Sequence, residues 1–108
     1  MTKKLHIDTL CVQAGYNPTK GEPRQVPIIQ STTFKYDTSE QMGKLFDLEE
    51  NGYFYTRLQN PTNDTTAAQI AAMEGGVAAM LTSSGQAANF FACFNICQAG
   101  DHMITTTS

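Results

Sequence analysis

The chain has 108 residues, of which 41% are hydrophobic and 16% charged, with a net charge of −3 at pH 7 and a pI near 5.1. This length supports one small domain with a modest core. The slight acidity gives no reason to expect a nucleic acid or an anionic membrane as partner. No apolar run approaches the roughly 20 residues of a membrane-spanning helix, and no apolar stretch typical of a signal peptide follows the first residues.

Three cysteines, an odd number without secretory signals, favour reduced thiols and a cytoplasmic location. Cys93 and Cys97 lie four residues apart on an expected helix, but no further ligands at metal-binding spacing accompany them. We therefore interpret them as small core residues and predict no metal site.

Residues 1–37 are expected to be irregular, because glycine and proline occur five times between positions 15 and 27. The proline-interrupted apolar segment 26–29 fits an extended, packed arm better than a central strand. A short helix is predicted to begin at Thr38 or Ser39, since Thr38 and Gln41 have the spacing of a capping box. Its expected apolar stripe consists of Met42, Leu45 and Phe46.

The next helix has clear signals at both ends. Asn60 is a favourable N-cap, Pro61 suits the first helical position, and the pair Gly75-Gly76 supplies a permissive C-cap. Residues 77–82 then predict a buried strand, residues 85–98 a helix that is apolar nearly all round, and residues 102–106 the start of a second strand.

The order strand, helix, strand predicts a βαβ unit with a parallel pair. Parallel sheets need further strands and covering helices, which these 108 residues do not supply. The chain is therefore expected to be the N-terminal part of a larger α/β protein, or one piece of a cleaved chain.

Two segments have the chemistry of a phosphate site. Ser83-Ser84-Gly85-Gln86 combines hydroxyl groups, a glycine and a helix N-terminus, although an ordinary capped helix start explains these four residues equally well. Tyr55 and Arg57 lie on the same side of an extended segment, and arginine suits a phosphate fork. A surface arginine above a packed tyrosine is the simpler interpretation of that pair taken alone.

Taken together, three motifs resemble the Cys/Met-metabolism family of pyridoxal-phosphate (PLP) enzymes. They are Tyr55-Thr56-Arg57-x-x-Asn60-Pro61-Thr62, Met73-Glu74-Gly75-Gly76 and Ser83-Ser84-Gly85-Gln86-Ala87-Ala88. Within the family the pattern is most similar to the O-acetylhomoserine sulfhydrylases, on the weak hints of Gln86 and of Thr56 between Tyr55 and Arg57.

The resemblance implies the α/β architecture of a fold-type-I, aspartate-aminotransferase-like PLP enzyme. Residues 1–60 would be an N-terminal arm and subunit-contact region, and residues 61–108 the incomplete beginning of the PLP-binding large domain with its parallel-rich sheet. Gly85 and Gln86, with Ser84 nearby, would hold the cofactor phosphate. Tyr55 and Arg57 would reach that phosphate from the neighbouring subunit of a homodimer or a dimer-of-dimers tetramer.

The implied reaction is γ-replacement, in which O-acetylhomoserine and sulfide give homocysteine and acetate. Methionine γ-lyase and cystathionine γ-synthase or lyase are alternatives within the family. A non-catalytic module that binds a phosphorylated ligand or a partner chain is an alternative of another class. The family's Schiff-base lysine has no counterpart among these residues, so no catalytic residue is assigned and the piece alone is expected to be inactive.

Overall fold

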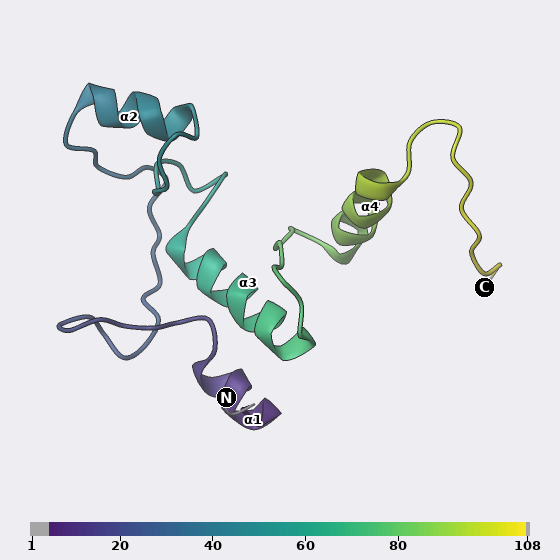
Figure 1. Cartoon of the computed structure of the whole chain (residues 1–108), viewed down its shortest axis with the longest axis horizontal. Helices are drawn as coiled ribbons and strands as arrows, with labels where there is room; N and C mark the ends of the chain where they lie inside the picture. Colours follow the sequence, from purple (N-terminus) through teal and green to yellow (C-terminus); the bar gives the residue numbers. More distant parts are fainter. Residues whose placement is uncertain (1–4, 108) are drawn as a thin grey trace.

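The structure, a computed structural model, describes residues 5–107. Residues 1–4, part of the segment expected to be irregular, and Ser108, the last residue of the expected large-domain segment, lie outside this range. Within it, four α-helices follow one another: α1 (Ile7–Gln13), α2 (Ser39–Phe46), α3 (Pro61–Glu74) and α4 (Gly85–Ile96). Figure 1 shows α1 beside α3, with α2 and α4 as separate limbs.

The described chain is open. Its radius of gyration is 17.9 Å and its extents are 53 × 40 × 29 Å, whereas a compact domain of this length has a radius of gyration of about 13 Å. Leu45, Phe54 and Ala71 are the buried hydrophobic residues of this range, and Asn60 is the buried polar one. The hydrophobic core is therefore small, and hydrogen bonds account for much of the local order.

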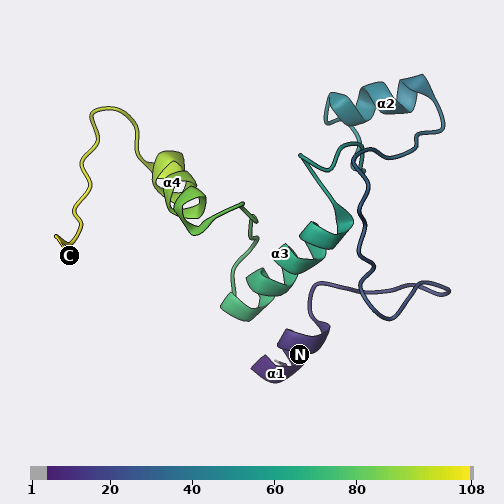
Figure 2. The same cartoon turned by 180° about the vertical axis from the view of Figure 1, so that it is seen from behind.

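Helix α1 corrects the expectation that residues 1–37 are irregular. The imidazole Nδ1 of His6 caps the helix by accepting from the Asp8 N–H at 3.4 Å. The sequence signal was an apolar stripe at Ile7, Leu10 and Cys11, but a helix of only about two turns gives too short a periodic pattern to stand out. Figure 2 shows from behind that α1 packs along α3. A seven-residue helix is marginal alone, so this packing stabilises it.

Gly15 allows α1 and α3 to approach closely. It has a φ of +82°, and a Cβ at this position would meet the Thr65 carbonyl oxygen and lie 2.7 Å from the Gln69 nitrogen. The Gln69 side chain in turn donates to the Leu10 carbonyl at 3.4 Å. Glycine is needed here both for the left-handed backbone and for the absence of a side chain.

Helix α2 forms as predicted, with one difference in its cap. The Thr38 hydroxyl oxygen accepts from the Gln41 N–H at 3.1 Å, but the Gln41 side chain accepts from the Asp37 N–H instead of the Thr38 N–H. Leu45 is buried, and the Phe46 ring packs against Phe54 in a tilted arrangement, with ring centroids 4.6 Å apart. The expected apolar stripe therefore packs, although its two outer members stay largely exposed.

Helix α3 confirms both of its predicted ends. Asn60 caps it by accepting from the Thr62 N–H at 2.9 Å, and Pro61 occupies the first helical position. Gly75 closes the helix in the left-handed conformation at a φ of +66°, and its N–H bonds to the Ala71 carbonyl. The extended arm at 26–29 was also expected, and it lies against the start of this helix.

The two predicted strands do not form. Residues 77–82 and 102–106 belong to no strand, and the single β-bridge of the described range joins Thr33 to Tyr55. Parallel strands need neighbouring strands for their backbone hydrogen bonds, and residues 5–107 provide none beside these segments. The βαβ expectation is thus wrong as a description of this chain by itself.

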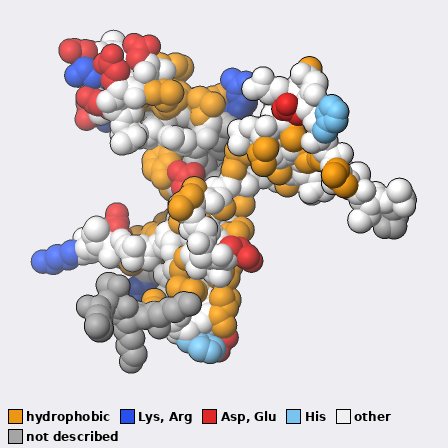
Figure 3. Space-filling view, turned by 45° about the vertical axis from the view of Figure 1, so that its right-hand side comes forward, with side chains coloured by type: hydrophobic (Ala, Val, Ile, Leu, Met, Phe, Trp, Pro, Cys, Tyr) orange, Lys and Arg blue, Asp and Glu red, His pale blue; other side chains and the backbone are white. Residues whose placement is uncertain are grey.

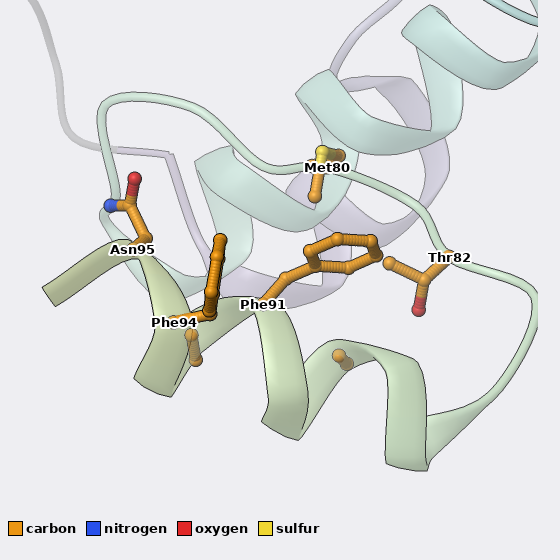
Figure 4. A pocket seen from close by; sticks show the side chains of 7 residues that line it. Met80, Thr82, Phe91, Phe94 and Asn95 are labelled. Carbon is orange, nitrogen blue, oxygen red and sulfur yellow. The ribbon is translucent and has the colours of Figure 1, made fainter. Parts of the chain in front are cut away.

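Helix α4 ends at Ile96, two residues earlier than predicted, and Cys97 is its C-cap. Its apolar side chains are not buried, with Phe90 58% and Phe94 68% exposed, and Figure 3 shows hydrophobic side chains along this limb. Cys93 is exposed as well, which corrects the interpretation of the cysteines as core residues. Figure 4 shows Phe91 pointing towards Met80 and Thr82, which belong to the segment before this helix.

Candidate functional site

The Tyr55–Arg57 segment forms a turn. The Tyr55 carbonyl accepts from the Leu58 N–H at 3.0 Å and from the Gln59 N–H at 3.1 Å. The guanidinium carbon of Arg57 lies 5.1 Å from the centroid of the Tyr55 ring. The two side chains are therefore side by side, as predicted, but a turn brings them together and the expected extended backbone does not.

Arg57 is an exposed cation, and no carboxylate of residues 5–107 forms a salt bridge with it. Its guanidinium interacts with the half-buried Tyr55 ring, which limits where the charge can lie. A planar fork of N–H donors held above an aromatic ring is suited to a phosphate or carboxylate.

The N-terminal arm holds this turn in place. The Thr56 N–H donates to the Thr32 carbonyl at 2.9 Å, the Thr56 hydroxyl donates to the Ser31 carbonyl, and Thr33 forms a β-bridge with Tyr55. Three backbone-directed interactions over three consecutive residues fix the turn from one side. The position of Arg57 thus depends on a segment more than twenty residues away in the sequence.

The Ser84 turn is the second half of the predicted site. The Ser84 hydroxyl oxygen caps α4 by accepting from the Ala87 N–H at 3.1 Å, and the Thr82 hydroxyl donates to the Ser84 carbonyl at 2.9 Å. The N–H groups of Gly85 and Gln86 come before the first backbone donor of the helix, the Ala88 N–H that bonds to the Ser84 carbonyl, so they have no partner in the helix. A Cβ placed on Gly85 would meet nothing within 4 Å, so the approach to these N–H groups is open.

No hydrogen bond or ion pair of the described range joins the two halves of the predicted site. A cavity of about 160 Å³ beside Arg57 is lined by residues 56–60, by the first turns of α3 and by residues 79–81, and the Ser84 turn takes no part in its wall. Tyr55 and Arg57 are thus brought together with each other, and Ser84, Gly85 and Gln86 form a separate cluster. Within residues 5–107, the two halves of the predicted site are therefore not joined.

Tyr53 lies near the turn, with its ring centroid 5.7 Å from that of Phe34. Burial and the adjacent carboxylate of Asp64 raise the pKa of the Tyr53 hydroxyl above its ordinary value. Burial and the negative charge of Asp64 both disfavour the negatively charged phenolate form of Tyr53. The Tyr53 hydroxyl is therefore expected to lose its proton only at a pH above the ordinary range for tyrosine.

Sequence reasoning assigned Asn60 to the helix cap alone and gave Thr62 no part in the site. Their other bonds reach residues 27–29, and no short-range sequence pattern indicates such contacts. The one available signal was the residue type of Asn60. An asparagine side chain has two N–H donors as well as an acceptor oxygen, and a cap uses only the oxygen, so the donors need other partners when the side chain is buried.

Comparison with known proteins gives a consistent result. The profile of the family described as Cys/Met metabolism PLP-dependent enzyme matches residues 8–108. O-acetyl-L-homoserine sulfhydrylase 1 of Thermus thermophilus is 42% identical over 106 residues, which cover 94% of this chain and 24% of that protein. L-methionine gamma-lyase of Fusobacterium nucleatum is 43% identical over 104 residues, covering 96% of this chain and 26% of that protein. The chain spans about a quarter of the length of the curated relatives it matches.

Among solved structures, one from Campylobacter jejuni, assigned as an O-acetylhomoserine (thiol)-lyase, superimposes with a TM-score of 0.81 at 35% identity. The match covers 90% of this chain and 23% of that one, which carries a pyridoxyl-lysine-5'-monophosphate. The open arrangement in Figure 1 is therefore that of a segment of a fold-type-I PLP enzyme, and the expected fold class is confirmed. The chain belongs to the Cys/Met metabolism family of PLP-dependent enzymes.

Proposed function

We propose that these residues form the N-terminal part of a PLP-dependent O-acetylhomoserine sulfhydrylase, referred to below as the full-length enzyme. The observation that carries the proposal is the presence of two groups of residues suited to bind a phosphate. One is the exposed Arg57 beside Tyr55, and the other is the N-terminus of α4. Neither group contacts the other within the described residues. The similarity to the sulfhydrylases of Thermus thermophilus and Leptospira meyeri supports this choice of reaction.

The residues present fit the phosphate of PLP. At the start of α4, the free N–H groups of Gly85 and Gln86 lie at the positive end of the helix dipole, with open space beside Gly85. Ser84 uses its hydroxyl oxygen on the Ala87 N–H, so its hydroxyl hydrogen remains available as a donor. Arg57 adds a positive charge that no described carboxylate neutralises.

In the proposed arrangement, Gly85, Gln86 and Ser84 hold the phosphate of their own subunit. Tyr55 and Arg57 reach the phosphate bound by the neighbouring subunit of a homo-oligomer, which explains why one chain leaves them apart. The same proposal assigns residues 1–60 to an N-terminal arm and subunit-contact region. It assigns residues 61–108 to the beginning of the PLP-binding large domain, and it places the enzyme in the cytoplasm.

PLP supplies an electron sink for carbon–hydrogen and carbon–oxygen bond cleavage in a bound amino acid. The contribution of the residues described here is to bind and orient. A dianionic phosphate gripped by backbone N–H groups and a charge-assisted fork fixes the cofactor against the reacting atoms. O-acetylhomoserine and sulfide are the proposed substrates, and homocysteine and acetate the proposed products.

Cofactor spectroscopy followed by product analysis tests the proposal. The full-length enzyme supplied with PLP is expected to show a visible absorbance band that borohydride fixes covalently, and to form homocysteine from O-acetylhomoserine and sulfide. The absence of a cofactor band would refute the PLP role. A band without homocysteine formation would refute the sulfhydrylase assignment alone.

Methionine γ-lyase is a second candidate, favoured by the 43% identity to the enzyme of Fusobacterium nucleatum. The two reactions share the cofactor and its anchoring, so residues 5–107 do not separate them. Incubation with methionine alone distinguishes them, because a γ-lyase releases methanethiol whereas a sulfhydrylase leaves methionine unchanged.

A further inference from the structure

The side chain of Asn60 lies where three segments of the chain meet. It is 3% exposed and makes three hydrogen bonds: Oδ1 accepts from the Thr62 N–H at 2.9 Å, and Nδ2 donates to the Ile29 carbonyl at 3.0 Å and to the Thr56 hydroxyl at 3.1 Å. One carboxamide thus joins the arm, the Tyr55–Arg57 turn and the first turn of α3. A helix cap needs the first of these bonds alone.

Thr62 extends this junction along the arm. Its hydroxyl donates to the Pro27 carbonyl at 2.8 Å and accepts from the Ile29 N–H at 2.9 Å. Thr56 lies between Tyr55 and Arg57. Its hydroxyl accepts from the Asn60 side chain and donates to the Ser31 carbonyl, so it links Asn60 to the arm. A polar group buried with all its bonds made is rigid, and it is costly to disturb.

We infer that Asn60 is a positioning residue for cofactor binding, which acts by holding the Thr56 hydroxyl and thereby the Arg57 guanidinium. This inference rests on the proposed function, because it specifies how the proposed phosphate ligand is held. Asn60 touches no cofactor in this scheme. Its carboxamide keeps the turn locked between the arm and α3, so that Arg57 has little conformational entropy to lose when a phosphate arrives.

Substitution by aspartate separates this role from helix capping. Asn60→Asp has nearly the same shape and caps equally well, but its carboxylate donates neither to Ile29 nor to Thr56. Asn51→Asp is the matched control, since it makes the same charge change at an exposed residue with no described partner. Thr56→Val and Thr56→Ser form a second pair, in which the first loses the hydroxyl and the second keeps it.

The experiment measures the PLP dissociation constant of the full-length enzyme by fluorescence titration of the apoenzyme. We expect Asn60→Asp and Thr56→Val to raise this constant about tenfold, and Thr56→Ser and Asn51→Asp to leave it within about twofold. In an Arg57→Ala background, Asn60→Asp and Thr56→Val should raise it less than twofold further, because the group that they position is already absent.

If Asn60→Asp and Thr56→Val weaken PLP binding equally in the presence and absence of Arg57, the inference is overturned, because equal losses of affinity indicate general destabilisation. An unchanged dissociation constant for Thr56→Val would overturn it as well, even if Asn60→Asp fails to fold. A full-length protein that binds no PLP before any substitution would instead refute the proposed function, and the positioning role with it.

Discussion

Residues 5–76 and residues 77–107 of this chain are ordered by different means. The first region contains the arm, α1–α3, every buried residue and nearly all long-range hydrogen bonds. The second contains α4 between two segments that form no strand, with its phenylalanines exposed. Contacts far apart in the sequence but within the chain thus suffice for the first region, whereas the second needs a sheet that residues 5–107 do not supply.

The largest expected effect concerns the exposed apolar surface of α4. We expect the isolated 108-residue chain to aggregate or remain unfolded, because exposed apolar side chains promote association. Phe90→Ser combined with Phe94→Ser should increase the soluble monomer, measured by sedimentation velocity. Asn89→Ser combined with Asn95→Ser, at exposed polar positions of the same helix, is the control and should change little. If the isolated chain is soluble and unfolds in a cooperative thermal transition, residues 77–107 do not need a sheet from outside the described residues.

In the first region the largest effect is expected at Gly15. Gly15→Ala places a Cβ against the backbone of α3 and imposes a left-handed backbone on alanine, so it should cost at least about 3 kcal/mol. Gly21→Ala is the control, because its φ of +90° is similar but a Cβ there meets nothing within 4 Å. It should cost about 1 kcal/mol. Urea unfolding of the full-length enzyme measures both values, and equal losses would show that the α1–α3 approach is unimportant.

Arg57, the residue of the first region that is proposed to bind the cofactor phosphate, provides the next test. Arg57→Ala should weaken PLP retention of the full-length enzyme by about 1–3 kcal/mol, the range of a hydrogen bond to a charged group. Arg24→Ala, which removes the same charge from an exposed loop, should have little effect. Equilibrium dialysis measures the difference. Equal affinities for the two variants would remove Arg57 from the proposed site.

The corresponding test in the second region is Gly85→Ala. The added methyl group meets nothing within the chain, so the folding of α4 should be unaffected. Crowding of the phosphate beside the helix terminus should still lower PLP affinity, by about 1–3 kcal/mol. Circular dichroism and cofactor titration of the full-length enzyme separate the two effects. Unchanged affinity would place the phosphate elsewhere.

The smallest effect is a pH dependence confined to alkaline conditions. The pKa of Tyr53 is raised in the folded chain, first by burial and then by the Asp64 carboxylate. An unfolded tyrosine ionises from about pH 10, so above this pH the folded state binds more protons and stability falls as the pH rises. Below it both states are protonated and Tyr53 contributes no pH dependence. Asp64→Asn should lower the Tyr53 pKa in an absorbance titration, whereas Asp37→Asn should not.

The sequence was sufficient wherever the signal was local. Asn60 and Pro61 defined the start of α3, Gly75 defined its end, and Ser84 defined the start of α4, because caps depend on a few neighbouring residues. The same local chemistry indicated an anion site at Gly85 and Gln86. Helix α1 was missed because its seven residues give a weak periodic signal and packing on α3 stabilises it.

By itself, then, the sequence determined the family, the starts of α2, α3 and α4, the end of α3 and the residue types suited to a phosphate. The tertiary structure decided how these residues are held. The bond of Asn60 to Ile29 joins residues 31 positions apart, and the close approach of Gly15 to α3 joins residues about 50 positions apart. The same holds for residues 77–82, whose apolar run forms no strand because no neighbouring strand of residues 5–107 pairs with its backbone.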